Sequence, residues 1–205
     1  MGMTMNNTDL AQDLDRQAIA RVIADWAIFR DCRDWVRLRA LYAPGATMVT
    51  TWLRGTADEF VDISMAPAKQ GGNVQHVIGP PSIALNGNRA IAIARVTIMV
   101  RGIVHGTQVD VACTGRFHDW LARGADGWKI VQRMPIYEKD RMDPVEPGAT
   151  VKLDKTMLER IAPGYRYLGY LQTLGGTAVI TDLPAPGSAE ERKLYDDSAA
   201  WLAGG

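Results

Sequence analysis

The chain has 205 residues, of which 47% are hydrophobic and 22% are charged, a composition typical of a soluble globular protein with one good core. Lys plus Arg and Asp plus Glu number 23 each, so no net charge attracts nucleic acid or an anionic membrane surface, and we expect neither as a partner. Two cysteines, Cys32 and Cys113, are too few for a disulfide framework. The sequence shows no secretory signal and no apolar run long enough to span a membrane, so we expect a cytoplasmic protein.

The first part of the chain is predicted to be helical. Apolar residues recur at helical spacing over residues 13–30, which predicts a first helix. The sequence DWVRLRALYAPG predicts a short second helix, with Asp34 as its N-cap and Pro44-Gly45 at its end. Residues 46–53 favour a strand because they are rich in β-branched side chains, and a third helix is expected to begin near Thr56.

From here to about residue 142 the chain is expected to form strands joined by turns. Gly71 and Gly72 predict a mobile link into the strand that holds His76. Further strands are predicted over residues 83–85, 89–101, 106–121 and 128–137. Helices followed by a strongly curved antiparallel sheet indicate an α+β fold, in which the sheet wraps around the N-terminal helices as a cone-shaped barrel with a central pocket.

The character of the sequence changes near residue 143. Prolines, glycines and aromatic residues follow, and Ser188 with Glu191 predicts a capping box ahead of an amphipathic helix. This segment is too short to bury enough surface for independent folding. We therefore expect residues 1–142 to form one domain. Residues 143–205 are expected to be an extension that closes the mouth of the cone or packs on a neighbouring subunit.

His76 is the first candidate for chemistry. Strand alternation places Val74, His76 and Ile78 on the same, more apolar face, where a buried imidazole needs hydrogen-bond partners. Either His76 is a core histidine bonded to a backbone carbonyl, or it works with a second catalytic group. Asp31 is that candidate, because Asp34 is better placed to cap the second helix and leaves Asp31 without an obvious structural task.

The order of these motifs resembles a known family. A helix that ends in an aromatic residue and DxxDW, then LYAPGA, a strand with one inward histidine, and DGWKIVQR in the last long strand resemble the SnoaL-like branch of the nuclear-transport-factor-2-like superfamily. The resemblance covers roughly residues 10–141. Members include scytalone dehydratase, bile-acid dehydratase and hexachlorocyclohexane dehydrochlorinase. It implies a catalytic dyad of Asp31 and His76, with Arg133 as a pocket arginine and trimers as the assembly.

The dyad is chemically reasonable without this resemblance. A neutral imidazole is a good base near neutral pH, and a carboxylate bonded to its other nitrogen fixes the tautomer and stabilises the imidazolium that forms. Such a base contributes roughly 10²–10⁴-fold to a rate. Arg133 either stabilises a developing oxyanion or leaving group, or forms an ion pair at a strand end with Asp140 or Glu138.

The predicted substrate site is made of large apolar side chains. Its members are Trp26, Met48, Trp52, Met99, Val100 and Phe117. His105 and His118 have no metal-ligand spacing and are expected to be solvent-exposed or structural, so neither a metal nor a cofactor is expected.

These expectations favour a cofactor-independent lyase. His76, oriented by Asp31, would remove a proton from a small hydrophobic, aromatic or polycyclic substrate, and a hydroxyl group, a halide or, by retro-aldol cleavage, a carbon fragment would leave. An isomerase or cyclase of the same fold is one alternative, and a non-catalytic binding or assembly protein is another. A homo-oligomer is expected because a curved sheet leaves a broad outer face. The resemblance to the dehydratases favours a trimer.

Overall fold

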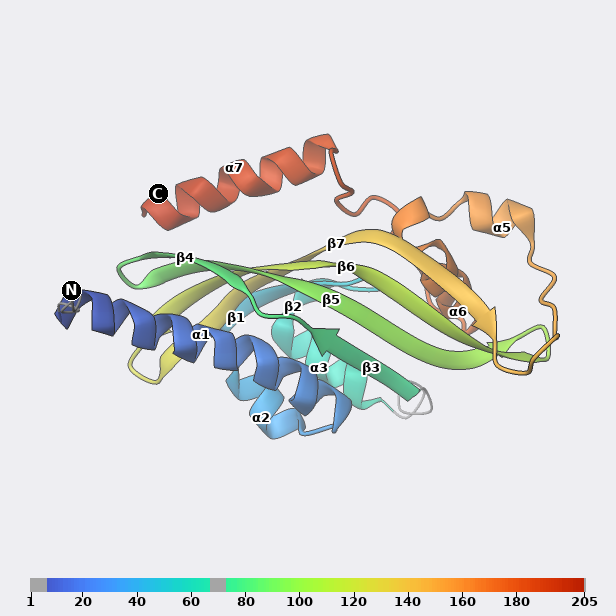
Figure 1. The fold of residues 1–205 in the computed structure, drawn as a ribbon, viewed down its shortest axis with the longest axis horizontal. Coiled ribbons are helices and arrows are strands. Elements are labelled where there is room, and N and C mark those ends of the chain that lie inside the picture. Colours follow the sequence, from blue (N-terminus) through green and yellow to red (C-terminus); the bar gives the residue numbers. More distant parts are fainter. Residues whose placement is uncertain (1–6, 67–72, 205) are drawn as a thin grey trace, which may run out of the picture.

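A computed structural model describes residues 7–66 and 73–204. Gly71 and Gly72, which were predicted to form a link, lie outside the described residues. The N-terminal helices cover one face of a strongly curved sheet (Figure 1). This arrangement confirms the predicted α+β class. The sheet is open along its edges and does not close into a complete barrel.

Three helices precede or interrupt the first strands. They are α1 (Asn7–Asp31), α2 (Trp35–Ala40) and α3 (Ala57–Met65). Asp34 caps α2 by accepting a hydrogen bond from the backbone N–H of Arg37 at 3.1 Å. Thr56 caps α3 in a capping box with Glu59. Both predicted helix starts are confirmed, and Asp31 at the end of α1 is left free of capping.

Within residues 7–66 and 73–204, seven strands form a single mixed sheet. They are β1 (Tyr42–Val49), β2 (Arg54–Thr56), β3 (Asn73–Ile78), β4 (Ser82–Asn86), β5 (Arg89–Val104), β6 (Thr107–Gly124) and β7 (Gly127–Pro144). Their order is β2-β1-β7-β6-β5-β3, and β4 also pairs with β5. Every pairing is antiparallel except that of β1 with β7, which is parallel.

The region around β1 differs from the sequence prediction. The second helix ends at Ala40, so Pro44-Gly45 do not end it as predicted. These two residues lie within β1. Of the strand predicted over residues 46–53, residues 46–49 belong to β1, and residues 50–53 form a tight turn that leads into β2. Thr50 makes this turn, because its hydroxyl oxygen accepts hydrogen bonds from the backbone N–H groups of Trp52 and Leu53 at 3.1 and 3.0 Å.

The C-terminal extension packs on the sheet at two places. Its elements are α5 (Lys155–Glu159), η1 (Pro163–Tyr165), α6 (Arg166–Leu174) and α7 (Ala189–Ala203). In Figure 1, α7 lies across the face of the sheet opposite α1, and α6 lies at the far end of the long strands. The division at residues 142 and 143 stays a prediction, and the last strand ends at Pro144.

Polar contacts fix both helices of the extension. The Asp140 carboxylate on β7 accepts hydrogen bonds from the backbone N–H groups of Tyr167 and Leu168 at 2.6 and 2.8 Å, at the start of α6. Ser188 caps α7 as predicted, accepting from the Glu191 N–H at 3.1 Å. The Glu191 carboxylate does not complete the predicted capping box with Ser188. It accepts instead from the backbone N–H of Gly187 and from Arg116 on β6.

We predict that a single methyl group at Gly164 loosens the extension from the sheet. A Cβ atom at Gly164 would lie 2.5 Å from the backbone oxygen of Tyr137 on β7, a contact that only a shift of η1 can relieve. The Gly164→Ala variant should lose about 1–3 kcal/mol of unfolding free energy in urea denaturation. Gly124→Ala is the matched control, since a Cβ atom there meets nothing within 4 Å. Equal stability of the two variants would contradict this packing.

Candidate active site

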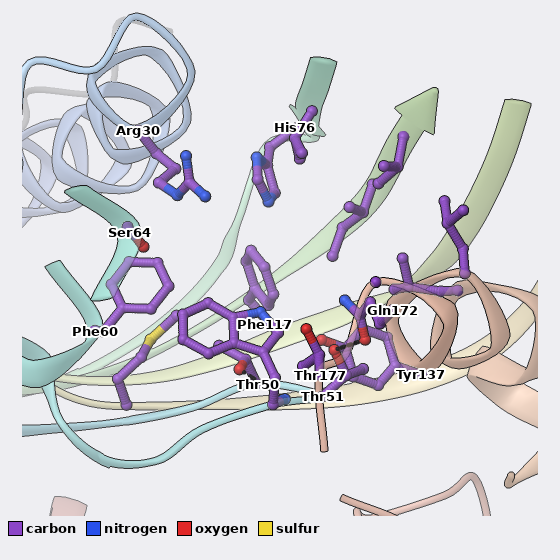
Figure 2. A pocket seen from close by; sticks show the side chains of 18 of the residues that line it. Arg30, Thr50, Thr51, Phe60, Ser64, His76, Phe117, Tyr137, Gln172 and Thr177 are labelled. Carbon is purple, nitrogen blue, oxygen red and sulfur yellow. Dashed lines mark hydrogen bonds between the residues drawn. The ribbon is translucent and has the colours of Figure 1, made fainter. Parts of the chain in front are cut away.

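A cavity of about 230 Å³ lies between the N-terminal helices, the inner face of the sheet and α6 (Figure 2). Aromatic and aliphatic side chains supply most of its wall, including Trp26, Met48, Trp52, Val100 and Phe117. These five residues were predicted from the sequence to bind substrate, and all of them line the cavity. The space is therefore apolar, with a few polar groups at defined positions.

Asp31 and His76 meet at the wall of this cavity. Asp31 Oδ1 lies 2.7 Å from His76 Nδ1, and Asp31 Oδ2 accepts a hydrogen bond from the His76 backbone N–H at 2.6 Å. The His76 side chain is 8% exposed and the Asp31 side chain 21% exposed. A carboxylate accepts hydrogen bonds, so Nδ1 carries the hydrogen and Nε2 is the basic nitrogen of the neutral ring. The catalytic role of the pair stays a prediction.

The surroundings of His76 favour its neutral form. Burial lowers the pKa of the imidazole below its usual 6.5, and the nearby positive charges of Arg30 and Arg133 act in the same direction. The hydrogen bond and charge of Asp31 act against this lowering but do not cancel it. The ring is therefore uncharged at neutral pH and is available as a proton acceptor.

Trp26 positions the ring from the other side. Its indole meets His76 edge-on with 5.2 Å between ring centroids, and it meets Phe117 in the same way at 5.4 Å. The indole N–H donates a hydrogen bond to the hydroxyl group of Tyr42 at 2.6 Å. Burial raises the pKa of Tyr42 to about 12, so this phenol stays neutral. Trp26, which contacts the imidazole, is consequently held in place by Tyr42 and Phe117.

Arg133 lies behind this wall and is not among the residues that line the cavity. It is completely buried, and it forms a bidentate ion pair with Asp119 at 2.7 and 2.8 Å. Its guanidinium lies 4.2 Å from the ring centroid of Trp26 and 4.4 Å from that of Phe117. A cation over two aromatic faces stabilises their positions.

The partner of Arg133 differs from the sequence alternatives. Asp140 and Glu138 were considered as strand-end partners, but Asp140 bonds to α6 and Glu138 bonds to Arg116. The register of β6 and β7 places Asp119 directly opposite Arg133, which accounts for the buried pair.

Met99 was predicted to line the pocket, but it is not among the lining residues. The pairing of β3 with β5 places His76 opposite Ile98 and places Gln75 opposite Met99. Ile98 lines the cavity together with His76, so Met99 lies on the other face of the sheet, beside Gln75.

Several polar residues of the cavity were not recognised from the sequence. They are Arg30, Thr50, Thr51, Ser64, Tyr137, Gln172 and Thr177. For Arg30 a signal existed, since it follows Trp26 by four residues and therefore shares its helix face. Gln172 and Thr177 come from the extension, and Thr51 donates a hydrogen bond to Gln172 Oε1 at 2.7 Å. Nothing in the sequence pattern links these segments.

The other two histidines lie away from the cavity. His105 is exposed and contacts the hydroxyl group of Tyr170 at 2.7 Å. His118 is fully buried beneath α7, so it is structural and not solvent-exposed; its Nε2 lies 2.9 Å from Ser198 Oγ, and burial lowers its pKa to about 4. Among residues 7–66 and 73–204, no group of three or more His, Cys, Asp or Glu side chains is arranged to hold a metal ion.

Comparison with known proteins identifies the family of the domain. Residues 12–134 match the SnoaL-like domain. The chain belongs to the SnoaL-like family. This SnoaL-like protein is 32% identical over 185 residues to pea pathogenicity protein 2 of Fusarium vanettenii. The aligned region covers 87% of this chain and 78% of that protein.

In the part of the chain that the structure describes, no helix is both long and apolar enough to cross a membrane.

Solved structures support the same fold. A type 2 hexachlorocyclohexane dehydrochlorinase superposes with a TM-score of 0.55 at 14% identity, covering 72% of this SnoaL-like protein and 98% of that chain. A putative scytalone dehydratase from Novosphingobium aromaticivorans superposes with a TM-score of 0.51 at 16% identity, and the superposition covers 74% of this chain and 99% of that chain. These likenesses concern the fold, which is of the nuclear-transport-factor-2-like type.

We predict that the pKa of His76 lies below the usual histidine value and that Asp31 prevents the His76 pKa from falling further. In ¹³C-histidine NMR titrations, the His76 midpoint should lie below 6.5, because burial disfavours the charged ring. The Asp31→Asn variant should lower the midpoint again, since it removes the negative charge that favours protonation. A His76→Asn variant assigns the signal. A midpoint above 6.5, or one that rises in Asp31→Asn, would contradict the described environment.

Proposed function

We propose that this protein is a cofactor-independent lyase of a small hydrophobic, aromatic or polycyclic compound. In this proposal His76 is the general base, Asp31 orients it, and a hydroxyl group, a halide or a carbon fragment leaves the substrate. The observation that carries the proposal is the 2.7 Å contact of Asp31 with His76 at the wall of an apolar cavity.

The geometry supplies what this chemistry requires. Asp31 fixes the hydrogen on Nδ1, so Nε2 is free to accept a proton from a C–H or O–H group of the substrate. The imidazolium that forms is stabilised by the same carboxylate. The proton is then available to a leaving hydroxyl group, which departs as water, so one ring acts first as base and then as acid.

The cavity wall suits an aromatic or polycyclic substrate. Trp52 stacks near Phe60 with 5.6 Å between ring centroids, and both line the cavity. Flat apolar walls of this kind bind planar rings and exclude water, which strengthens charge interactions near His76. Arg133 acts in this proposal by holding Trp26 and Phe117, since it lies behind them.

Elimination is favoured over isomerisation by the relatives of similar fold. Two of them are described as a hexachlorocyclohexane dehydrochlorinase and a putative scytalone dehydratase, names that denote the loss of hydrogen chloride and of water. Among the described lining residues of the cavity, His76 is the one side chain that is basic and uncharged at neutral pH. A single such base is sufficient for a proton abstraction that is followed by departure of a leaving group.

We predict that turnover depends on His76 and Asp31. Purified wild-type protein is incubated with a panel of hydroxylated and halogenated aromatic and steroid compounds, and products are measured by liquid chromatography with mass spectrometry. His76→Asn should lower kcat/KM by roughly 10²–10⁴-fold, the usual contribution of a general base. Asp31→Asn should lower it as well, because the ring loses the partner that fixes its tautomer.

The control for this experiment is His105→Asn. His105 is exposed, lies outside the cavity and has a positive φ of 48°, which asparagine tolerates. This variant should retain wild-type turnover. Unchanged turnover in both His76→Asn and Asp31→Asn would end the proposal of a catalytic pair.

A further inference from the structure

Arg30 brings a positive charge to the cavity, and its guanidinium lies near aromatic rings. Among residues 7–66 and 73–204, no carboxylate lies within ion-pair distance of its guanidinium. Asp31, its neighbour in sequence, acts on Arg30 through its negative charge but forms no direct ion pair with it, and both Asp31 oxygens are bonded to His76. The Arg30 guanidinium instead lies 5.5 Å from the ring centroid of Trp35 and 5.9 Å from that of Phe60. Aromatic faces support a cation but leave its N–H groups unpaired.

The Nε atom of Arg30 is buried and has no hydrogen-bond partner in the described part of the chain. A buried N–H of a charged group without a partner is uncommon and costs stability. Burial lowers the pKa of Arg30, yet an arginine retains its charge at neutral pH. The Nε–H of Arg30 is therefore a charged donor without an acceptor among the described residues.

Ser64 presents a second donor of the same kind. It lies on α3, its residue is 2% exposed, and its Oγ atom also has no partner among the described residues. A helical serine ordinarily bonds to the carbonyl oxygen four residues earlier, but Ser64 does not make this bond to Phe60. Ser64 and Arg30 both line the cavity that His76 lines.

Figure 2 shows how these groups are arranged. Arg30 and His76 extend toward each other from two different elements, and Ser64 lies below Arg30 beside the ring of Phe60. The electrostatic influence of Arg30 on His76 is consistent with this proximity. Two unpaired donors, one of them charged, consequently lie together at the basic end of an apolar cavity.

We propose that Arg30 and Ser64 form a binding site for an anionic oxygen of an aromatic ligand, such as a carboxylate or an enolate oxygen. The identification of this ligand with the substrate rests on the proposed lyase function. The anionic oxygen accepts hydrogen bonds from the Arg30 guanidinium and from the Ser64 hydroxyl, while the rings pack between Trp52 and Phe117. Charge-assisted hydrogen bonds in an apolar site are strong, which makes this pair a determinant of specificity.

The experiment compares two probes that differ in charge. Binding of 2-naphthoate and of its neutral amide, 2-naphthamide, is measured by isothermal titration calorimetry at about pH 8, where a histidine is neutral and supplies no charge. Wild-type protein should bind the carboxylate more tightly by roughly ten- to a hundredfold, as charge-assisted hydrogen bonds provide. Arg30→Met should abolish this preference, and Ser64→Ala should reduce it.

Arg21→Met is the matched control, because Arg21 is exposed on the same helix and the substitution changes the net charge equally. It should retain the wild-type preference. Thermal unfolding checks that each variant is folded, and Ser64→Ala provides a conservative second test. Equal affinity of wild-type protein for the two probes, binding of neither probe, or a preference that survives Arg30→Met would overturn the proposal.

Failure of this site and failure of the lyase function give different results. If the preference for the carboxylate persists in His76→Asn while no compound in the panel is turned over in a His76-dependent way, the anion site stands and the lyase function is overturned. If turnover depends on His76 but the two probes bind equally, only the anion site is overturned.

Discussion

The hydrogen bonds between Asp31 and His76 join the end of α1 to strand β3, and the candidate site depends on this junction. One carboxylate binds both the ring and the backbone N–H of the same histidine, at 2.7 and 2.6 Å. The first bond sets the tautomer of the His76 ring, and the second fixes the position of β3 relative to the end of α1. A side chain that bonds to both the ring and the backbone of a base orients that base strongly, and Trp26 supports the ring from the other side.

Two arginines near His76 have opposite surroundings, and the contrast explains their different tasks. Arg133 is completely buried and is neutralised by Asp119, so it supports Trp26 and Phe117 as part of the core. Arg30 lines the cavity, lies near two aromatic rings and forms no direct ion pair with a described carboxylate. The cavity thus combines a neutral base with a cation that makes no direct ion pair among the described residues.

The extension changes the cavity beyond what the shared domain provides. The match to the SnoaL-like domain ends at residue 134, yet Leu168, Gln172 and Thr177 line the cavity from the far side. Their positions follow from the docking of η1 and α6 on β7, where Asp140 holds the first N–H groups of α6. Proteins with the same domain and different extensions would therefore enclose cavities of different shape and polarity.

Local patterns in the sequence determined where α2, α3 and α7 begin, and the inward direction of His76. Asp34 and Thr56 cap as predicted, and because Asp34 caps α2, Asp31 was correctly left free to reach the sheet. These features depend on neighbours within one or two turns or on alternation along one strand, which is information that a short sequence window contains.

Tertiary structure alone decided which residues meet across elements. Strand β5 is apolar on both faces, so only its pairing with β3 excluded Met99 from the cavity. Asp119 became the partner of Arg133 through the register of β6 and β7, which is shifted by an irregularity beside Trp120. Gln172 reached the cavity only because the extension folds back on the sheet. Register and docking arise from contacts between distant segments, and periodicity within one segment carries no information about them.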